Sequence, residues 1–283
     1  MTYIAPGIQS GDVVLGGLFS GGVFGRRSVT FPPIQAARPL YVIGDVHGRA
    51  DLLVPLVDKI MQDAAGTGSE TLRPELVFVG DIVDRGPESR SVVEFLAAVQ
   101  EWPELDSIFL VGNHELMLLQ FLNDPVIGRR WLRYGGYETL MSYDPGRIGD
   151  LGDDDELRRI AGVLKEAMGP HLEFIENLRP WHSNGNLLIT HAGADPVLAP
   201  EQQTIEALVW GVPSFHQHHR EDGLWVVHGH TIVQTPSVRE GRIAIDSGAY
   251  KTGVLTALKV DGTEVEFITE TGAPSPEADE YDI

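Results

Sequence analysis

Residues 40–48 read LYVIGDVHG, a four-residue apolar run followed by two glycine-flanked residues of metal-ligand type, Asp45 and His47. The apolar run has the length and composition of a buried strand. Directly after it, from Asp51 to Ala64, apolar residues recur at the spacing of an amphipathic helix. This stretch therefore predicts a strand and a helix, with two polar side chains in the loop between them.

Two further strings repeat this arrangement. GDIVDRG at 80–86 and GNHE at 112–115 each close an apolar run of four residues. The first polar residues of the three strings lie 36 and 32 residues apart, which is about the length of a strand–helix–strand unit. Since such units connect by right-handed crossovers, we expect a mostly parallel sheet here, with a second helix from Glu88 to Trp102.

Three later apolar runs also end in residues of metal-ligand type. They lie at 187–189, 225–227 and 243–245, and they end at His191, at His228 and His230, and at Asp246. Buried strands that all end in this way place their polar residues along one edge of a sheet. A row of Asp, His and Asn side chains at strand ends is a typical arrangement for gathering two divalent metal ions.

Composition excludes several classes of function. The 283 residues include 21 basic and 41 acidic ones, a formal charge of −20, so nucleic acid and anionic membranes would be repelled. The absence of cysteine excludes disulfides, thiolate metal sites and a thiol nucleophile. No apolar run is long enough to cross a membrane, and no basic start with an apolar core marks a signal peptide. We therefore predict a cytoplasmic protein that binds neither nucleic acid nor membrane.

The chain is expected to consist of a leader, one domain and a tail. Residues 1–38 form a glycine-rich leader, and 271–283 form an acidic tail. Between them, 39–270 read as a single domain. Within that domain, 115–180 are predicted to form a helical cap inserted between the two halves of the sheet structure.

The expected fold class is α/β, a sandwich of two sheets flanked by helices. Strands predicted at 243–245, 254–260 and 264–268 alternate in polarity and fit a second, mainly antiparallel sheet. The Asp261-Gly262 step predicts a tight hairpin turn between the last two strands. The functional site is expected at the strand ends.

Taken in order, the motifs resemble those of the metallophosphoesterase superfamily. They are GDVHG, GDIVDRG, GNHE, HAG at 191–193 and HGHT at 228–231. GDIVDRG resembles the PPP-type protein phosphatases. WLRYGGYETL (131–140), IDSGAY (245–250) and KTGVLTAL (251–258) resemble their bacterial, phage-lambda-like serine/threonine branch. This resemblance covers most of the chain and implies the calcineurin-like metallophosphoesterase fold.

The resemblance also implies two divalent metal ions. The implied ligands are Asp45 and His47 for the first ion, Asp81 as a bridge, and Asn113, His191 and His230 for the second ion. Carboxylate, amide and imidazole ligands without thiolate fit Mn²⁺ or an Fe/Zn pair. A hydroxide shared by the two ions would attack phosphorus directly, which agrees with the absence of a thiol nucleophile.

Three more residues act on the phosphate in this pattern. His114 would protonate the leaving-group oxygen, and Asp84 would hydrogen-bond and orient its imidazole. Arg85 would clamp two phosphate oxygens through its planar guanidinium. Without the resemblance, His114 also fits a plain helix start, and Asp84-Arg85 fits an ion pair in a turn.

One departure from the family concerns a second phosphate-binding arginine. The family commonly has Trp-x-Arg between the HAG and HGHT motifs, whereas residues 210–213 are Trp-Gly-Val-Pro. The candidates that could replace the arginine are Arg220 first, then Arg129, Arg130 or Arg133 from the cap. Otherwise the site works with a single arginine.

Other polar residues have plainer interpretations. His228 is predicted to be structural, and Glu115 to support its loop and not to bind metal. The histidine-rich stretch at 216–219 has no partnering motif, so we predict a solvated loop. Tyr250 either lines the mouth of the pocket and contacts substrate or packs in the core.

The function predicted from these residues is that of a metal-dependent phosphomonoesterase. The expected substrates are phosphoproteins or phosphopeptides, on Ser/Thr and also on Tyr, and the acidic surface favours basic flanking residues. A dinucleoside tetraphosphate hydrolase is the alternative, because that family shares most of these motifs. A nuclease or other phosphodiesterase is disfavoured by the charge of −20, and a catalytically inactive phosphate-binding scaffold is the alternative of another class.

Overall fold

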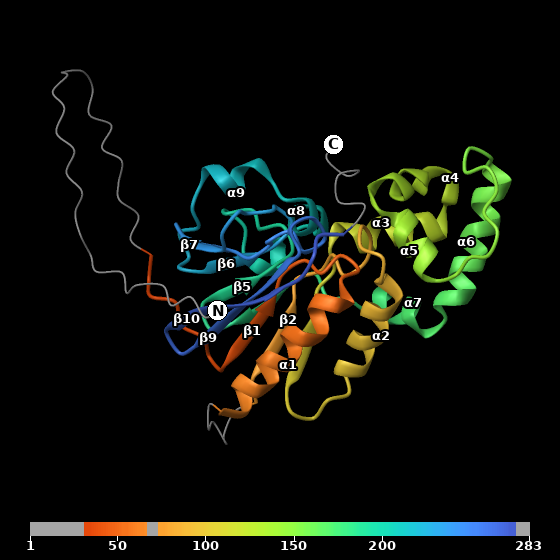
Figure 1. The fold of residues 1–283 in the computed structure, drawn as a ribbon. Coiled ribbons are helices and arrows are strands. Elements are labelled where there is room, and N and C mark those ends of the chain that lie inside the picture. Colours follow the sequence, from red (N-terminus) through yellow and green to blue (C-terminus); the bar gives the residue numbers. More distant parts are fainter. Residues whose placement is uncertain (1–30, 67–72, 276–283) are drawn as a thin grey trace, which may run out of the picture.

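The computed structural model describes residues 31–66 and 73–275, and it contains two five-stranded sheets (Figure 1). The first sheet has the order β10-β9-β1-β2-β3, with β1 (Leu40–Ile43), β2 (Glu75–Phe78), β3 (Asp106–Phe109), β9 (Val254–Asp261) and β10 (Glu264–Thr271). The second has the order β4-β5-β6-β8-β7, with β4 (His182–Asn184), β5 (Leu187–Ile189), β6 (Trp225–His228), β7 (Ser237–Arg239) and β8 (Arg242–Ala244). The predicted α/β fold with two sheets is therefore confirmed.

The two sheets bury one apolar layer between them. Leu40 and Val42 of β1 pack in this layer with Ile189 and Val227 of the second sheet. The alternate residues of β1 point the other way, toward the helices, as the two-residue period of a strand requires. Each central strand is therefore buried on both faces, which explains its continuous apolar sequence.

Helices cover the outer face of each sheet. On the first sheet these are α1 (Ala50–Gly66) and α2 (Ser89–Val99), which confirm the two helices predicted from periodicity. On the second sheet, Leu208 and Val209 of α8 (Ile205–Trp210) and Phe215 of α9 (Pro213–Gln217) pack against β5 and β6. A short 3-10 helix at Pro200–Gln202 precedes α8.

A group of helices follows β3 and precedes β4, and Figure 1 shows most of it as a yellow-green lobe beside the sheets. Its elements are α3 (Asn113–Asn123), α4 (Pro125–Gly128), the 3-10 helix η1 (Arg129–Tyr134), α5 (Gly136–Ser142), α6 (Asp154–Met168) and α7 (Pro170–Glu176). Buried residues of α6 share one apolar core with those of α1 and α2. The cap boundaries at 115 and 180 stay a prediction.

The chain around the domain edges is described only in part. Backbone N–H groups of Gln35 and Ala37 donate to the side chains of Asn186 and Asn184, so residues 35–37 lie along the second sheet. Residues 1–30 of the predicted leader and 276–283 of the predicted tail lie outside the described residues. None of the helices in the described ranges is long and apolar enough to cross a membrane.

One sheet assignment made from the sequence is wrong. Both β9 and β10 belong to the first sheet, where β9 pairs antiparallel with β1, and the second sheet has β5, β6 and β8 parallel. After β8 the chain crosses between the sheets through α10 (Ala249–Thr252). The predicted hairpin is present, with Gly262 at a φ of 58° in a two-residue turn.

Candidate active site

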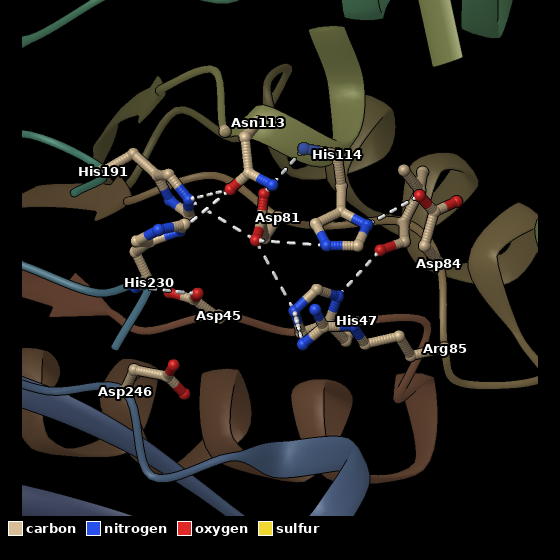
Figure 2. Close-up of polar contacts among 12 residues, drawn as sticks. Asp45, His47, Asp81, Asp84, Arg85, Asn113, His114, His191, His230 and Asp246 are labelled. Carbon is tan, nitrogen blue, oxygen red and sulfur yellow. Dashed lines mark hydrogen bonds and ion pairs between the residues drawn. The ribbon is translucent and has the colours of Figure 1, made fainter. Parts of the chain in front are cut away.

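Polar residues from the strand ends converge in one buried cluster, with Asp81 at its centre (Figure 2). The Oδ2 atom of Asp81 lies 3.5 Å from His47 Nε2, 3.4 Å from His191 Nε2 and 3.9 Å from His114 Nε2. These side chains are almost completely inaccessible to solvent. The structure therefore brings together residues that the sequence separates by as many as 144 positions, from 47 to 191.

A second contact point is the side-chain oxygen of Asn113, at the start of α3. Its Oδ1 lies 2.9 Å from Nε2 of His191 and 2.9 Å from Nδ1 of His230. Figure 2 shows these three side chains on the opposite side of Asp81 from His47 and Arg85. Two imidazoles, an amide oxygen and a carboxylate thus face one another, which is a ligand set that divalent cations accept.

Backbone carbonyls hold two of the imidazoles in a fixed orientation. The Nδ1 atom of His47 lies 3.0 Å from the carbonyl oxygen of Val83, and Nδ1 of His191 lies 3.1 Å from that of Val79. A hydrogen bond from Nδ1–H to a carbonyl leaves Nε2 pointing into the cluster. This is the arrangement that commonly orients metal-binding histidines.

The cluster contains two groups of three residues whose ligand atoms lie within 4.8 Å of one another. One is His47, Asp81 and His114, and the other is Asp81, His191 and His230. Both groups contain Asp81, the residue expected to bridge two ions. The sequence predicts Asp45 and His47 as ligands of the first ion, whereas the group around His47 in the structure contains His114 and not Asp45.

Asp45 nevertheless lies at the edge of the cluster with an unused oxygen. Its Oδ2 accepts the backbone N–H of His230 at 2.9 Å. Its Oδ1 is buried and has no hydrogen-bond partner among the described residues. A buried carboxylate oxygen without a partner is costly, and a bound cation would remove that cost. The donor set therefore fits the divalent ions that the motifs imply.

Charges within the cluster shift several pKa values. Burial opposes ionisation of Asp81, but His191 and His114 together hold its pKa well below the usual range. Burial also disfavours a charged His191, yet the neighbouring Asp81 and Asp45 raise its pKa to about 9. Burial, followed by repulsion from Asp246, raises the pKa of Asp45 well above its usual value. The site thus concentrates negative charge that a cation would neutralise.

Asp246 is a buried carboxylate at a predicted strand end that the motifs do not include among the metal ligands. Figure 2 shows it on the same side of the cluster as Asp45. Its Oδ1 accepts the N–H of Gly248 at 2.8 Å, and burial raises its pKa to about 6. The apolar run at 243–245 ends directly at Asp246, and this pattern could have placed Asp246 among the predicted site residues.

The backbone is strained at several of the residues that the sequence predicts for the site. Positive φ angles occur at His47 (47°), Asp81 (49°), Asp84 (72°), Arg85 (67°) and His230 (64°). Such angles cost non-glycine residues free energy, and they cluster at functional sites. The neighbouring glycines are sterically required: a Cβ on Gly112 would lie 2.1 Å from Asp81 Oδ1.

Glu115 supports the loop that carries Asp81, as the sequence predicts. Its carboxylate accepts N–H groups of Gly112 at 2.8 Å, Asp81 at 2.9 Å and Ile82 at 2.9 Å. Burial and the nearby Asp81 raise its pKa to about 7. The fourth residue of the GNHE motif therefore joins the loops after β2 and β3.

Asp84 and Arg85 lie next to His114, at one side of the cluster. His114 Nδ1 is 2.7 Å from Asp84 Oδ2, and Nε2 of the same ring points toward Asp81. Arg85 lies with Nη1 3.4 Å from His47 Nε2, while its buried Nε has no hydrogen-bond partner among the described residues. The Tyr250 ring packs 4.7 Å from the Arg85 guanidinium and 5.2 Å from the His47 ring.

The prediction that Arg220 swings into the site is corrected by its contacts. Its guanidinium donates to Asp222 and to the carbonyl oxygens of Asp195 and Leu198, at 3.0 and 2.9 Å for the carbonyls. All three nitrogens are thus engaged in closing a loop at 195–222. The guanidinium of Arg129 is likewise engaged, by Asp154 and by the carbonyl oxygen of Val126 in α4.

His228 has the structural surroundings that the sequence predicts, whereas the stretch at 216–219 is only partly a solvated loop. His216 lies in α9, and the half-buried His219 ring packs edge-on against Phe31 at 5.4 Å. His228 is buried, its Nδ1 lies 3.1 Å from the carbonyl oxygen of Gly229, and burial lowers its pKa to about 4. Its ring packs edge-on against Phe215 at 5.1 Å. His216 and His218 are exposed to solvent. None of these side chains contributes to the two groups around Asp81.

A comparison with protein families matches residues 38–234 to the calcineurin-like phosphoesterases. The chain belongs to this family. The match covers more than two thirds of the sequence and all of the motifs around Asp81. The family implies divalent metal ions, and the two residue groups that share Asp81 are candidate ligands for them.

Relatives of this phosphoesterase carry two kinds of name. The chain is 29% identical over 246 residues to bis(5'-nucleosyl)-tetraphosphatase PrpE [asymmetrical] of Halalkalibacterium halodurans, covering 81% of this chain and 92% of that protein. It is 27% identical over 237 residues to serine/threonine-protein phosphatase 2 of Escherichia coli, covering 79% and 93%. A solved structure of a provisionally named diadenosine tetraphosphatase shares the fold, with a TM-score of 0.57, 17% identity and coverage of 84% and 96%.

Proposed function

We propose that this metallophosphoesterase hydrolyses dinucleoside tetraphosphates and cleaves them asymmetrically, to a nucleoside triphosphate and a nucleoside monophosphate. The observation that carries the proposal is the match to the PrpE tetraphosphatase along 92% of that protein's length. Dinucleoside tetraphosphates therefore become the first proposed substrate class, ahead of phosphoproteins, because the chain matches serine/threonine-protein phosphatase 2 at slightly lower identity.

The residues around Asp81 support hydrolysis of a phosphate ester or anhydride. Two divalent ions bound there would activate water and neutralise phosphate charge. The buried Nε–H of Arg85 has no hydrogen-bond partner within the described part of the chain, and we propose that it binds a phosphate oxygen. His114 is oriented by Asp84 so that Nε2 faces the cluster, and we propose that it donates a proton to the departing oxygen.

Two exposed apolar side chains near His230 favour a nucleotide. Trp210, at the end of α8, is 45% exposed and its ring lies 6.5 Å from the His230 ring. Ile232 is 38% exposed and lies two residues beyond His230. A flat aromatic ring next to a phosphate site suits a nucleobase, since stacking contributes about 1–3 kcal/mol per base.

The test is product analysis with diadenosine tetraphosphate and Mn²⁺. We expect ATP and AMP in equal amounts, and an increase of about tenfold or more in KM for Trp210→Ala, corresponding to the loss of one stacked base. Trp210→Phe, which keeps an aromatic face, is the matched control. Cleavage of p-nitrophenyl phosphate without cleavage of the dinucleotide would overturn the substrate class.

Protein phosphatase activity is the second candidate. The observation that favours it is the 27% identity to serine/threonine-protein phosphatase 2 of Escherichia coli, along 93% of that protein's length. A panel of phosphoserine, phosphothreonine and phosphotyrosine peptides decides between the candidates. A higher kcat/KM on a peptide with basic flanks than on diadenosine tetraphosphate would select this function.

A further inference from the structure

The segment WLRYGGYETL at 131–140 contacts the proposed site through its first and ninth residues. The indole N–H of Trp131 donates to Asp84 Oδ2 at 2.7 Å, and the hydroxyl of Thr139 donates to Asp84 Oδ1 at 2.6 Å. Trp131, Thr139 and Asp84 are all fully buried. Two elements of the helical group, η1 and α5, therefore hold both oxygens of one carboxylate.

Asp84 therefore has hydrogen-bond partners at both carboxylate oxygens and at its backbone N–H, and these partners restrict rotation of its side chain. Oδ2 lies 2.7 Å from His114 Nδ1 as well as from Trp131, and the backbone N–H of Asp84 donates to Thr139 Oγ1 at 2.9 Å and to Ser89 Oγ at 3.0 Å. The residue has a φ of 72°, which needs support from its surroundings. A carboxylate with this many donors has one defined orientation. Because His114 Nδ1 is hydrogen-bonded to this carboxylate, the orientation of the His114 ring is fixed as well.

The two glycines of the segment make this approach possible. The carbonyl oxygen of Gly135 accepts the backbone N–H of Arg85 at 3.0 Å. A Cβ on Gly135 would lie 2.6 Å from the backbone nitrogen of Arg85. A Cβ on Gly136 would lie 2.3 Å from the indole ring of Trp131. Residues 131–140 thus fit closely around both Asp84 and Arg85.

We propose that Trp131 and Thr139 are positioning residues for proton donation, acting through Asp84 on His114. The inference rests on the role of His114 in the proposed function but not on the choice between dinucleotide and phosphoprotein. It assigns the helices after β3 a part in the chemistry, because η1 and α5 set the direction of the imidazole that faces the departing oxygen.

The test compares two aryl phosphates that differ in how much their leaving group needs a proton. The variants are Trp131→Phe and Thr139→Val, each of which removes one donor to Asp84. With Mn²⁺ we expect kcat on phenyl phosphate to fall by about 30-fold or more, and kcat on p-nitrophenyl phosphate by less than about threefold, since a general acid matters most for a poor leaving group. Thr139→Ser keeps the hydroxyl and should restore the phenyl phosphate rate.

The matched control is Tyr143→Phe. Tyr143 is buried in the same group of helices, and its hydroxyl lies 2.9 Å from His171 Nδ1, away from Asp84. Its loss should leave the ratio of the two rates unchanged. In a His114→Asn background, Trp131→Phe should cause no further loss, because both changes would act on the same proton transfer.

A second readout does not depend on activity. The His114 ring proton shared with Asp84 should give a downfield ¹H NMR signal in the metal-free protein, assigned by its absence in His114→Asn. Trp131→Phe and Thr139→Val should move this signal, and Tyr143→Phe should not. Equal losses on both aryl phosphates, or an unmoved signal in folded variants, would overturn the proposal, while failure on the dinucleotide alone would overturn only the substrate class.

Discussion

Three imidazoles approach a single oxygen of Asp81, and this contact determines what the site can do. The carboxylate is buried, and its neighbours hold its pKa well below the usual range, so it stays ionised. Each ring has its other nitrogen engaged, in the case of His47 and His191 by a backbone carbonyl. An ionised, oriented cluster of this kind attracts cations without needing to rearrange.

The role proposed for His114 predicts the effect of removing its imidazole. His114→Asn should lower kcat on p-nitrophenyl phosphate, and more so on phenyl phosphate, by roughly 10²–10⁴-fold on the latter. Steady-state kinetics with Mn²⁺ measures this, and metal content by elemental analysis is the control. Turnover equal to that of the wild type would remove His114 from the chemistry.

The role proposed for Arg85 predicts a different kind of loss. Arg85→Lys keeps the charge but removes the planar fork, so kcat/KM should fall by an amount corresponding to about 2–3 kcal/mol. Arg220→Lys is the control, since Arg220 is engaged with Asp222 and two carbonyls. A larger loss of kcat/KM per folded molecule in Arg220→Lys than in Arg85→Lys would contradict the assignment.

Among the elements, β2 joins the two sheets at its first residue. Glu75 lies 2.6 Å from Arg38 Nη2 and accepts from His182 and Asn184 of β4, each at 2.8 Å. Burial opposes ionisation of Glu75, but these partners lower its pKa to about 2. Because a lowered pKa stabilises the folded protein only while the carboxyl is ionised, this contribution is present above the ordinary pKa and is lost as the pH falls toward 2.

Glu75→Gln should therefore reduce the free energy of unfolding at neutral pH by about 1.5–3 kcal/mol, the range for a lost hydrogen bond to a charged group. The difference between variant and wild type should shrink as the pH falls from about 4.5 to 2. Urea unfolding at several pH values measures it. Glu264→Gln, an exposed glutamate that also begins a strand, should have no effect, and a difference for Glu75→Gln that does not change with pH would contradict this account.

Apolar runs make much of the architecture predictable from the sequence. The long-range contact partners of individual side chains cannot be predicted in this way. The candidate ligands follow strands directly, so their convergence could be expected from the sequence. The contacts from Trp131 and Thr139 to Asp84 span 47 and 55 residues and depend on how η1 and α5 pack. For the same reason the alternation in β9 and β10 indicated strands but not the sheet they join. The carbonyl oxygens that hold Arg220 lie 25 and 22 residues before it, at Asp195 and Leu198, so the sequence pattern did not show that its guanidinium is engaged there.

At the scale of the whole molecule, a formal charge of −20 is combined with a buried group of carboxylates. Both features destabilise the metal-free protein, and both are relieved by bound cations. Binding of Mn²⁺ at 100 times its Kd should raise the free energy of unfolding by about 2.7 kcal/mol per site. Thermal melting with and without EDTA measures the gain, and an equal gain in Asp81→Asn would contradict it.

The central claim is that one carboxylate, Asp81, is shared by two cation sites. The most direct measurement is the number of Mn²⁺ ions bound per chain after equilibration and removal of free metal, in wild-type protein and in Asp81→Asn. The account predicts two ions in the wild type, and fewer than one, with loss of phosphoesterase activity, in the folded variant. Equal metal content in the two proteins, or a single ion in the wild type, would contradict it.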